Sequence, residues 1–417
     1  MTKMFRYAKS FGLVAMAIFL SGALLLGSVV PAKAEPQKVV KIGVAAPFTG
    51  AMADLGVPVN YGFIDAVKYL NELQSIEGLK VECTWYDIQY SISRMIIAHK
   101  RFREEGIALE FCVTSTLYEN MPDMLVRDEI PVLCGSPLTV SVMAMPKPKW
   151  FFPEFPTWID IFGVGMIGIK RMWTEERPVR IAFMGYDHPV VREAVNHGQW
   201  LSTKLGGVEF LGFEIVPFTA IDTSTEWLRL AAKKPDWVWV LSYAGNMVVQ
   251  VKDYHRLEIR KRGIEFCSTP AGIDETIIRI VRKSGEGVFA PRHTPTTFET
   301  EEWPGLKVIH EIAKRYRGTE PEDVASNYIL GANLGQIAFE AIRIAAEKVG
   351  VENVTGLAVR DSLASFRGFR SWVFPPFSMS DDKPYFVHYI RTYQVKQGKL
   401  VPIGDWYKAP YMSKELE

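Results

Sequence analysis

The sequence predicts an α/β protein whose chain forms two doubly wound parallel-sheet lobes. Apolar strand-like segments alternate with helix-like segments along most of the 417 residues, which is the pattern that βαβ units and parallel sheets produce. A proline-rich stretch at 145–157 interrupts the alternation, which then starts again. The chain is also long for one hydrophobic core, because chains beyond about 250–300 residues usually divide into several. Together these observations favour two lobes of similar architecture.

Residues 1–34 have the features of a secretory signal peptide. Basic residues at the start precede an apolar run at 11–30, and Ala32-Lys33-Ala34 matches an A-x-A cleavage signal. An uncleaved membrane anchor is the competing interpretation, because the apolar run is nearly long enough to span a bilayer. The cleavage signal favours export, so we expect cleavage after Ala34 and a periplasmic protein comprising residues 35–417.

Composition argues against several classes of function. The 48 lysines and arginines nearly balance the 47 aspartates and glutamates, so nothing favours binding to nucleic acid or to an anionic membrane surface. The four cysteines lie in or beside apolar runs without a C-x-x-C pair. We therefore expect buried free thiols, no metal site and no cofactor. A Cys112–Cys134 bridge stays open as an alternative if their strands are neighbours.

The first lobe begins with the apolar run Ile42–Ala46, which ends in Pro-Phe-Thr-Gly and a small-residue loop at 51–56. This is the pattern of a buried parallel strand followed by a turn and a helix. The strands and helices of this lobe are expected at 42–46, 61–73, 79–86, 91–105, 109–113, 116 onward and 130–134. Proline fixes the chain and removes hydrogen-bond donors, so the stretch 145–157 predicts a crossover between the lobes.

The second lobe repeats the alternation without repeating the sequence. Its strands are expected at 179–184, 208–216, 237–241 and 265–268, and its helices at 159–174, 190–205, 224–233 and 246–261. Near 288–291 the chain returns to the first lobe, with helices at 302–316, 323–349 and 356–366. Tail strands at 385–395 and 400–402 dock on the second lobe. The expected boundaries are 35–155 with 291–368 for lobe 1, and 156–290 with 369–417 for lobe 2.

Short motifs occur along the chain in an informative order. They include Lys41-Ile-Gly-Val, Pro47-Phe-Thr-Gly50, Val113-Thr114-Ser115-Thr116, Ile130-Pro131-Val132, Val179-Arg180-Ile181-Ala182 and Asp236-Trp237-Val238. In this order and spacing the chain resembles type 1 periplasmic solute-binding proteins of ABC importers, in the Leu/Ile/Val-binding branch. The resemblance implies two lobes that close on a small-molecule ligand, with a three-strand hinge near Phe155, Pro291 and 366–385. It also implies an inner-membrane ABC permease as partner, and we expect a monomer.

The candidate ligand residues of the first lobe follow the ends of predicted strands, where ligands of α/β sheets bind. Ser115 and Thr116 open a helix whose hydroxyl and amide groups suit a carboxylate or amide oxygen. Because Thr116 and Glu119 also match a capping box, a helix cap is the alternative. The resemblance aligns Ser115 with the family's ligand-binding serine. It places Ser136 in a ligand-contacting loop, where a plain turn is the alternative, and Leu55 over the ligand, where a core leucine is the alternative.

In the second lobe, Tyr243 matches a family tyrosine that closes on the ligand, with a structural tyrosine as the alternative. Asp187 or His188, in the loop 186–189, could also meet a ligand amine, although a solvated loop is the favoured interpretation for either. Ala271 lies where amino-acid binders of this family usually place a carboxylate for the ligand's ammonium. Since a buried ammonium needs a partner, either Asp187 or Asp274 replaces that carboxylate or the ligand is not an α-amino acid. The aromatic segment 150–152 then suggests an aromatic or aliphatic carboxylate, or an amide.

Other motifs favour no further chemistry. Gly163-Val-Gly-Met-Ile-Gly168 matches a dinucleotide fingerprint with Asp187 about 20 residues on, but no predicted strand precedes it, so we expect glycines packed inside a helix. The sequence contains no nucleophile elbow and no P-loop, which favours a binding protein over an enzyme. A ligand sensor that feeds a regulatory partner without transport is the second hypothesis. Neighbouring genes for permease and ATPase subunits would separate the two.

Overall fold

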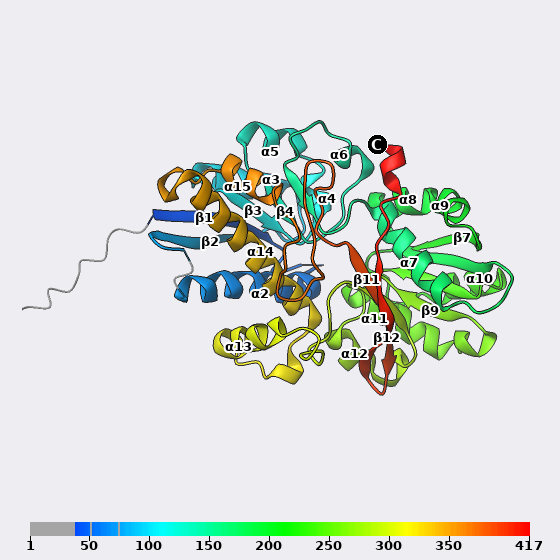
Figure 1. Cartoon of the computed structure of the whole chain (residues 1–417). Helices are drawn as coiled ribbons and strands as arrows, with labels where there is room; N and C mark the ends of the chain where they lie inside the picture. Colours follow the sequence, from blue (N-terminus) through cyan, green and yellow to red (C-terminus); the bar gives the residue numbers. More distant parts are fainter. Residues whose placement is uncertain (1–37, 51, 74–75) are drawn as a thin grey trace, which may run out of the picture. The chain divides into compact units, whose positions relative to one another are not determined.

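The computed structural model describes residues 38–50, 52–73 and 76–417 (Figure 1). The predicted signal peptide at 1–34 lies outside the described residues. The described chain contains a five-stranded sheet of order β2-β1-β3-β4-β5 and a seven-stranded sheet of order β12-β11-β10-β9-β8-β6-β7. Two separate sheets with helices between their strands confirm the predicted two-lobe α/β architecture.

The first sheet is built from the N-terminal third of the chain. Its strands are β1 (Lys38–Ala46), β2 (Leu79–Asp87), β3 (Leu109–Cys112), β4 (Val132–Cys134) and β5 (Phe151–Pro153). The pairs β1–β3, β3–β4 and β4–β5 are parallel. The strand β5 corrects the prediction that 145–157 is only a crossover. Phe151 and Phe152 are buried, and Pro153 is tolerated because β5 lies at the edge of the sheet.

The helices grouped with the first sheet come from both ends of the chain. They are α2 (Ala53–Glu72), α3 (Ile92–Glu104), α4 (Ser115–Tyr118), α5 (Pro122–Asp128), α6 (Val140–Met143), α13 (Gly305–Arg317), α14 (Ser326–Val349) and α15 (Gly356–Leu363). The expected loop at 51–56 is wrong from Ala53 onward, because α2 begins there and continues through Pro58. Close packing of α2 on α14 explains this. A Cβ added to Gly331 would lie 1.9 Å from the Val59 carbonyl oxygen, so only glycine permits the contact.

The helix α14 forms the centre of this lobe. It is long and apolar enough to cross a membrane by composition, but 78% of its apolar window is buried inside the protein. Most of its side chains contact neighbouring elements rather than solvent. Burial of this kind is typical of a core helix in a globular lobe.

The second sheet is mixed rather than purely parallel. Its strands are β6 (Val179–Tyr186), β7 (Val208–Val216), β8 (Trp237–Leu241), β9 (Glu265–Ser268), β10 (Phe289–Arg292), β11 (Tyr389–Lys396) and β12 (Lys399–Lys408). The strands β6 to β10 are parallel, whereas β11 and β12 are antiparallel. Gln397 and Gly398 join β11 to β12 with positive φ at both residues. Such a two-residue turn can connect only antiparallel strands.

The helices that accompany this sheet are α7 (Trp158–Met172), α8 (Pro189–Asn196), α9 (Gly198–Leu205), α10 (Ser224–Ala232), α11 (Ala244–Arg256) and α12 (Glu275–Val281). The single helix expected at 190–205 is two helices that meet at His197, and α12 was not predicted. The glycine motif 163–168 lies inside α7, as expected. A Cβ added to Gly165 would lie 1.4 Å from Trp239 Nε1, so this glycine permits close packing of α7 on β8.

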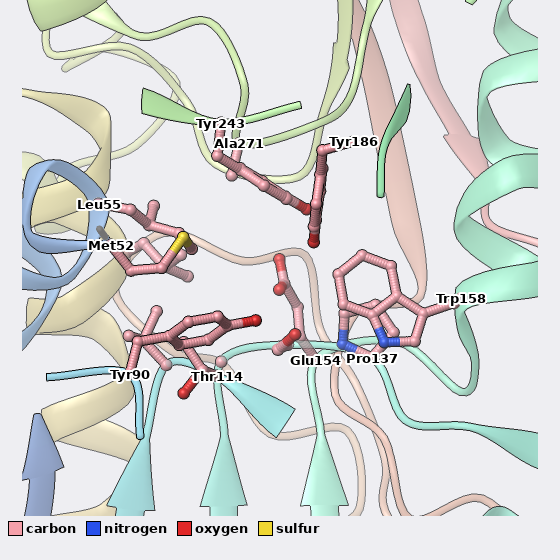
Figure 2. Close-up of a pocket in the computed structure, with 14 residues that line it drawn as sticks. Met52, Leu55, Tyr90, Thr114, Pro137, Glu154, Trp158, Tyr186, Tyr243 and Ala271 are labelled. Carbon is pink, nitrogen blue, oxygen red and sulfur yellow. The ribbon is translucent and has the colours of Figure 1, made fainter. Parts of the chain in front are cut away.

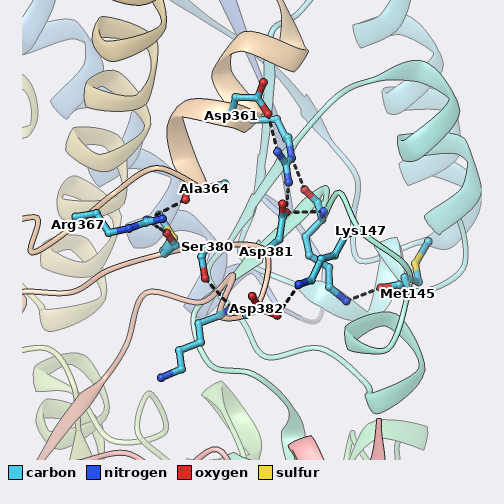
Figure 3. A network of polar contacts seen from close by, with 12 residues as sticks. Met145, Lys147, Asp361, Ala364, Arg367, Ser380, Asp381 and Asp382 are labelled. Carbon is cyan, nitrogen blue, oxygen red and sulfur yellow. Dashed lines mark hydrogen bonds and ion pairs between the residues drawn. The ribbon is translucent and has the colours of Figure 1, made fainter.

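Three connections join the two sheets, at 154–157, 293–304 and 364–388. The third is tied to the first lobe by a polar network (Figure 3). The backbone nitrogen of Lys149 donates to Asp381 at 2.9 Å, and Lys147 pairs with Asp382 at 2.5 Å. Arg360 also pairs with Asp381. These contacts fix the returning chain against the first lobe before it enters β11.

The cysteines are all free thiols. Cys112 and Cys134 occupy facing positions on β3 and β4, so the neighbouring strands that a bridge requires are present without the bridge. Cys112, Cys134 and Cys267 are buried, whereas Cys83 is partly exposed. Burial raises the pKa of the Cys112 thiol to about 12, which keeps it protonated and unreactive.

Candidate functional site

A small cavity lies at the carboxyl ends of strands from both sheets (Figure 2). Its volume is about 30 Å³, enough for a water molecule but not for an organic ligand. The lining residues are Met52, Leu55, Tyr90, Val113, Thr114, Gly135, Ser136, Pro137, Glu154, Trp158, Tyr186, Tyr243, Ala271 and Leu330. Because both sheets contribute, widening of the cavity requires side chains to move or the lobes to separate.

Aromatic rings form much of the cavity wall. Tyr186 and Tyr243 meet edge to face with their ring centroids 6.2 Å apart, and Trp158 and Tyr90 complete the wall. Burial raises the pKa of both Tyr186 and Tyr243, so their hydroxyls stay protonated and can donate hydrogen bonds. The hydroxyl of Tyr90, in the first lobe, lies 3.5 Å from Nε2 of His188, in the second lobe. This contact joins the two lobes beside the cavity.

Glu154 is the one charged side chain that lines the cavity among the described residues. It follows β5 directly and is only 6% exposed. Its Oε1 lies 2.5 Å from Nε2 of His293, a buried residue of the second connection. The imidazole of His293 lies between two phenylalanine rings, with centroids 5.5 Å from Phe155 and 5.7 Å from Phe374. Figure 2 shows the carboxylate pointing toward the tyrosines.

The sequence interpretation missed Glu154 because it assigned 145–157 to a crossover without a strand. A signal was present, since a single acid stands within the apolar stretch 150–158. A lone acid directly after a buried strand is a candidate for the ligand end of a parallel sheet.

The predicted first-lobe residues gather around the cavity. Ser136 and Leu55 line it. Ser115 is fully buried behind Ser136, with 3.4 Å between the two Oγ atoms. Thr116 lies in α4, and its side chain is outside the described part of the structure. Glu119, the other residue of the capping-box pattern, accepts from the backbone nitrogen of Thr139 at 2.9 Å.

The predicted second-lobe residues are divided. Tyr243 and Ala271 line the cavity, whereas Asp187 is exposed and pairs with Arg192 at 2.7 Å. Asp274 caps α12 by accepting from the Ile277 nitrogen at 2.9 Å, and burial raises its pKa to about 6. Neither acid expected to replace the missing carboxylate therefore lines the cavity.

The aromatic segment 150–152 also lies away from the cavity lining. Trp150 and Phe151 are buried in the core beside α5 and α6, and Phe152 belongs to the main core of the lobe. These rings consequently give no support to an aromatic ligand. The aromatic surface of the cavity comes from Tyr90, Trp158, Tyr186 and Tyr243 instead.

A wider groove adjoins the cavity between α2 and the helices α11 and α12. Its volume is about 600 Å³, and it shares Leu55 and Ala271 with the cavity. The other lining residues are Ala53, Asp54, Val57, Pro58, Gly245, Val248, Asp274, Thr276, Ile277, Ile280 and Asn327. Leu55 and Ala271 thus lie between the small cavity and a mostly apolar groove.

The sequence matches the periplasmic binding protein family over residues 39–399. The chain belongs to this family. The match confirms the resemblance seen in the sequence, and the two-sheet topology agrees with it. No curated protein matches the sequence significantly.

Solved structures show the same fold as this periplasmic binding protein. A valine-bound branched-chain amino acid ABC transporter protein from Thermus thermophilus is 18% identical, with a TM-score of 0.80 over 91% of this chain and 99% of that one. A fatty acid ABC transporter substrate-binding protein from Thermomonospora curvata is 14% identical, with a TM-score of 0.76 over 90% and 94%. An extracellular ligand-binding receptor from Rhodopseudomonas palustris HaA2 is 17% identical, with a TM-score of 0.69 over 88% and 100%. At these identities the likeness concerns the fold.

Two acids also meet between the lobes of this periplasmic binding protein. Glu193 of α8 accepts from the Val140 nitrogen of α6 at 3.2 Å, next to the Thr139 nitrogen that donates to Glu119. Burial raises the pKa of Glu119 to about 8, and the neighbouring Glu193 adds to that rise. Burial raises the pKa of Glu193 as well. The two carboxyls therefore come together most easily when protonated.

Proposed function

We propose that this chain is the periplasmic substrate-binding component of an ABC importer. It captures a small organic solute, such as a branched-chain or hydrophobic amino acid or a related carboxylate or amide, and delivers it to an inner-membrane permease. The observation that carries the proposal is the cavity lined by strand ends of both sheets. A ligand that contacts both lobes stabilises their closed arrangement over the open one.

The proposed ligand contacts follow from the cavity lining. Ser136 supplies a hydroxyl and Tyr243 a ring with a hydroxyl, while Leu55 and Ala271 form the apolar side toward the groove. Ser115 supports Ser136 from behind. Thr116 remains a proposed contact, and Asp187 stays a secondary one because it is exposed and already paired.

The cellular setting belongs to the same proposal. Residues 1–34 direct export, and residues 35–417 work as a periplasmic monomer that neither catalyses a reaction nor holds a cofactor. The proposed lobes comprise 35–155 with 291–368 and 156–290 with 369–417, except that Pro291 and Arg292 lie in β10 of the second sheet and so belong with lobe 2. The family match supports a periplasmic or extracellular location.

Uptake by living cells tests the transport role. Deletion of the gene should abolish high-affinity uptake of the radiolabelled compound that the purified protein binds. Plasmid-borne wild type should restore uptake, and Tyr243→Ala should restore little of it. Binding in vitro with unchanged uptake in the deletion strain would refute transport and leave a sensor.

A further inference from the structure

The charged residues of the cavity wall are unusual for a cavity that is expected to bind the polar group of a ligand. Among the described residues its wall contains no lysine, arginine or histidine, and its single charged group is Glu154. At 6% exposure Glu154 is almost fully withdrawn from water. A carboxylate in such a position is costly unless it is paired and hydrogen-bonded.

Only half of this carboxylate is partnered. Nε2 of His293 lies 2.5 Å from Oε1, at ion-pair distance but without hydrogen-bond geometry, and among the described residues no side chain pairs with Oε2. Figure 2 shows the carboxylate directed into the cavity. The hydroxyls and ring edges of Tyr90, Tyr186 and Tyr243 surround the space in front of it. The free oxygen therefore faces the place that a ligand would occupy.

The charge of Glu154 discriminates between the polar groups that a ligand can place in the cavity. A ligand carboxylate placed before Glu154 would meet a like charge, without any basic side chain in the described wall to offset it. A protonated amine would instead complete the hydrogen bonding of Oε2.

We propose that Glu154 accepts the protonated nitrogen of the ligand, so that the captured solute is an amine-bearing organic molecule. The inference rests on the proposed function and narrows its ligand class. It also explains why Ala271 carries no carboxylate, since the acid is supplied from the opposite lobe.

Glu154 also lies where the connections between the sheets meet. Its own segment is the first connection, His293 belongs to the second, and the Val387 nitrogen of the third donates to the Glu154 carbonyl at 3.0 Å. His293 is a positioning residue, because its Nε2 lies against Oε1 and leaves Oε2 directed toward the ligand. A nitrogen bound at Glu154 therefore acts directly on the segments that bend when the lobes close.

Paired probes test the inference by isothermal titration calorimetry at pH 7.5. Each pair contains an amine and the matching carboxylate that lacks the nitrogen: leucine with 4-methylpentanoate, phenylalanine with 3-phenylpropionate, and 3-methylbutylamine with 3-methylbutanoate. At least one amine should bind at least about 30-fold more tightly than its partner, the scale of a buried charge pair. Equal or tighter binding of the carboxylates would overturn the inference while leaving solute capture intact. Failure of every probe would count against both.

Variants at Glu154 and His293, with one control variant, locate the effect. Glu154→Gln keeps the shape of the side chain and should remove the preference for the amine, whereas Glu104→Gln, an exposed acid on α3, should leave it unchanged. His293→Gln should weaken amine binding by a smaller factor, and His293→Ala by a larger one, with carboxylate binding unaffected. An amine preference that survives Glu154→Gln in a folded protein would refute the assignment.

Discussion

The buried acid Glu119 makes stability depend on pH in a defined direction. Its pKa rises from the ordinary 4.5 to about 8 in the folded protein. Between these values the folded protein keeps a proton that the unfolded chain has released, so the free energy of unfolding falls as pH rises. The slope is at most about 1.4 kcal/mol per pH unit, which gives about 5 kcal/mol across the interval. Below about pH 4.5 and above about pH 8 this contribution is constant.

Urea unfolding followed by tryptophan fluorescence at half-unit steps from pH 4.5 to 9 measures this effect. Glu119→Gln is a neutral isostere and should gain stability over the wild type progressively with pH, by several kcal/mol at pH 8. Subtracting the variant cancels titrating groups that lie away from Glu119, such as His188, whose pKa burial lowers. Glu104→Gln is the matched control and should follow the wild type. Parallel curves for the wild type and Glu119→Gln would refute the reasoning.

Three further predictions concern packing and access. Gly331→Ala should lower the free energy of unfolding, measured in urea titrations, by about 3 kcal/mol because the new Cβ collides with the Val59 carbonyl. The control Gly245→Ala places a Cβ with nothing within 4 Å and should change the free energy of unfolding by less than about 1 kcal/mol. Ala271→Trp should fill the space between cavity and groove, both of which Ala271 lines, and should abolish ligand binding by calorimetry without lowering the melting temperature. Asp160→Ala should remove acceptors for the Met412 and Ser413 nitrogens, cost about 2–4 kcal/mol, and speed hydrogen exchange at the C-terminus.

Much of the fold could be predicted because periodicity and breakers are local signals. Strands such as 208–216 and 237–241 were placed correctly, since they are rich in β-branched and aromatic residues and directly follow turn residues. The strand β5 was missed because the prolines within and around it suggested an irregular segment. The early start of α2 was missed because its packing against Gly331 of α14 involves residues far apart in sequence. Long-range contacts of this kind override local propensity.

The site was predictable only in part. Ser136, Tyr243, Leu55 and Ala271 meet at one cavity because each follows or faces the end of a parallel strand. The sequence pointed to Asp187 and Asp274 as candidate acids, whereas Glu154 is the acid that lines the cavity among the described residues, since the choice among carboxylates depends on which side chains turn inward. That orientation is set by the pairing of β5 with β4 and by His293, which lies more than a hundred residues further on.

Ligand-dependent stabilisation tests the central claim most directly. The exported protein and its Tyr243→Ala variant should be heated with a panel of amino acids, amines, carboxylates and amides while unfolding is monitored. We predict that at least one compound raises the melting temperature of the wild type by several degrees at about 100 times its Kd, as mass action requires, and has little effect on the variant. Absence of any shift, or equal shifts in both proteins, would contradict capture of a small solute between the lobes.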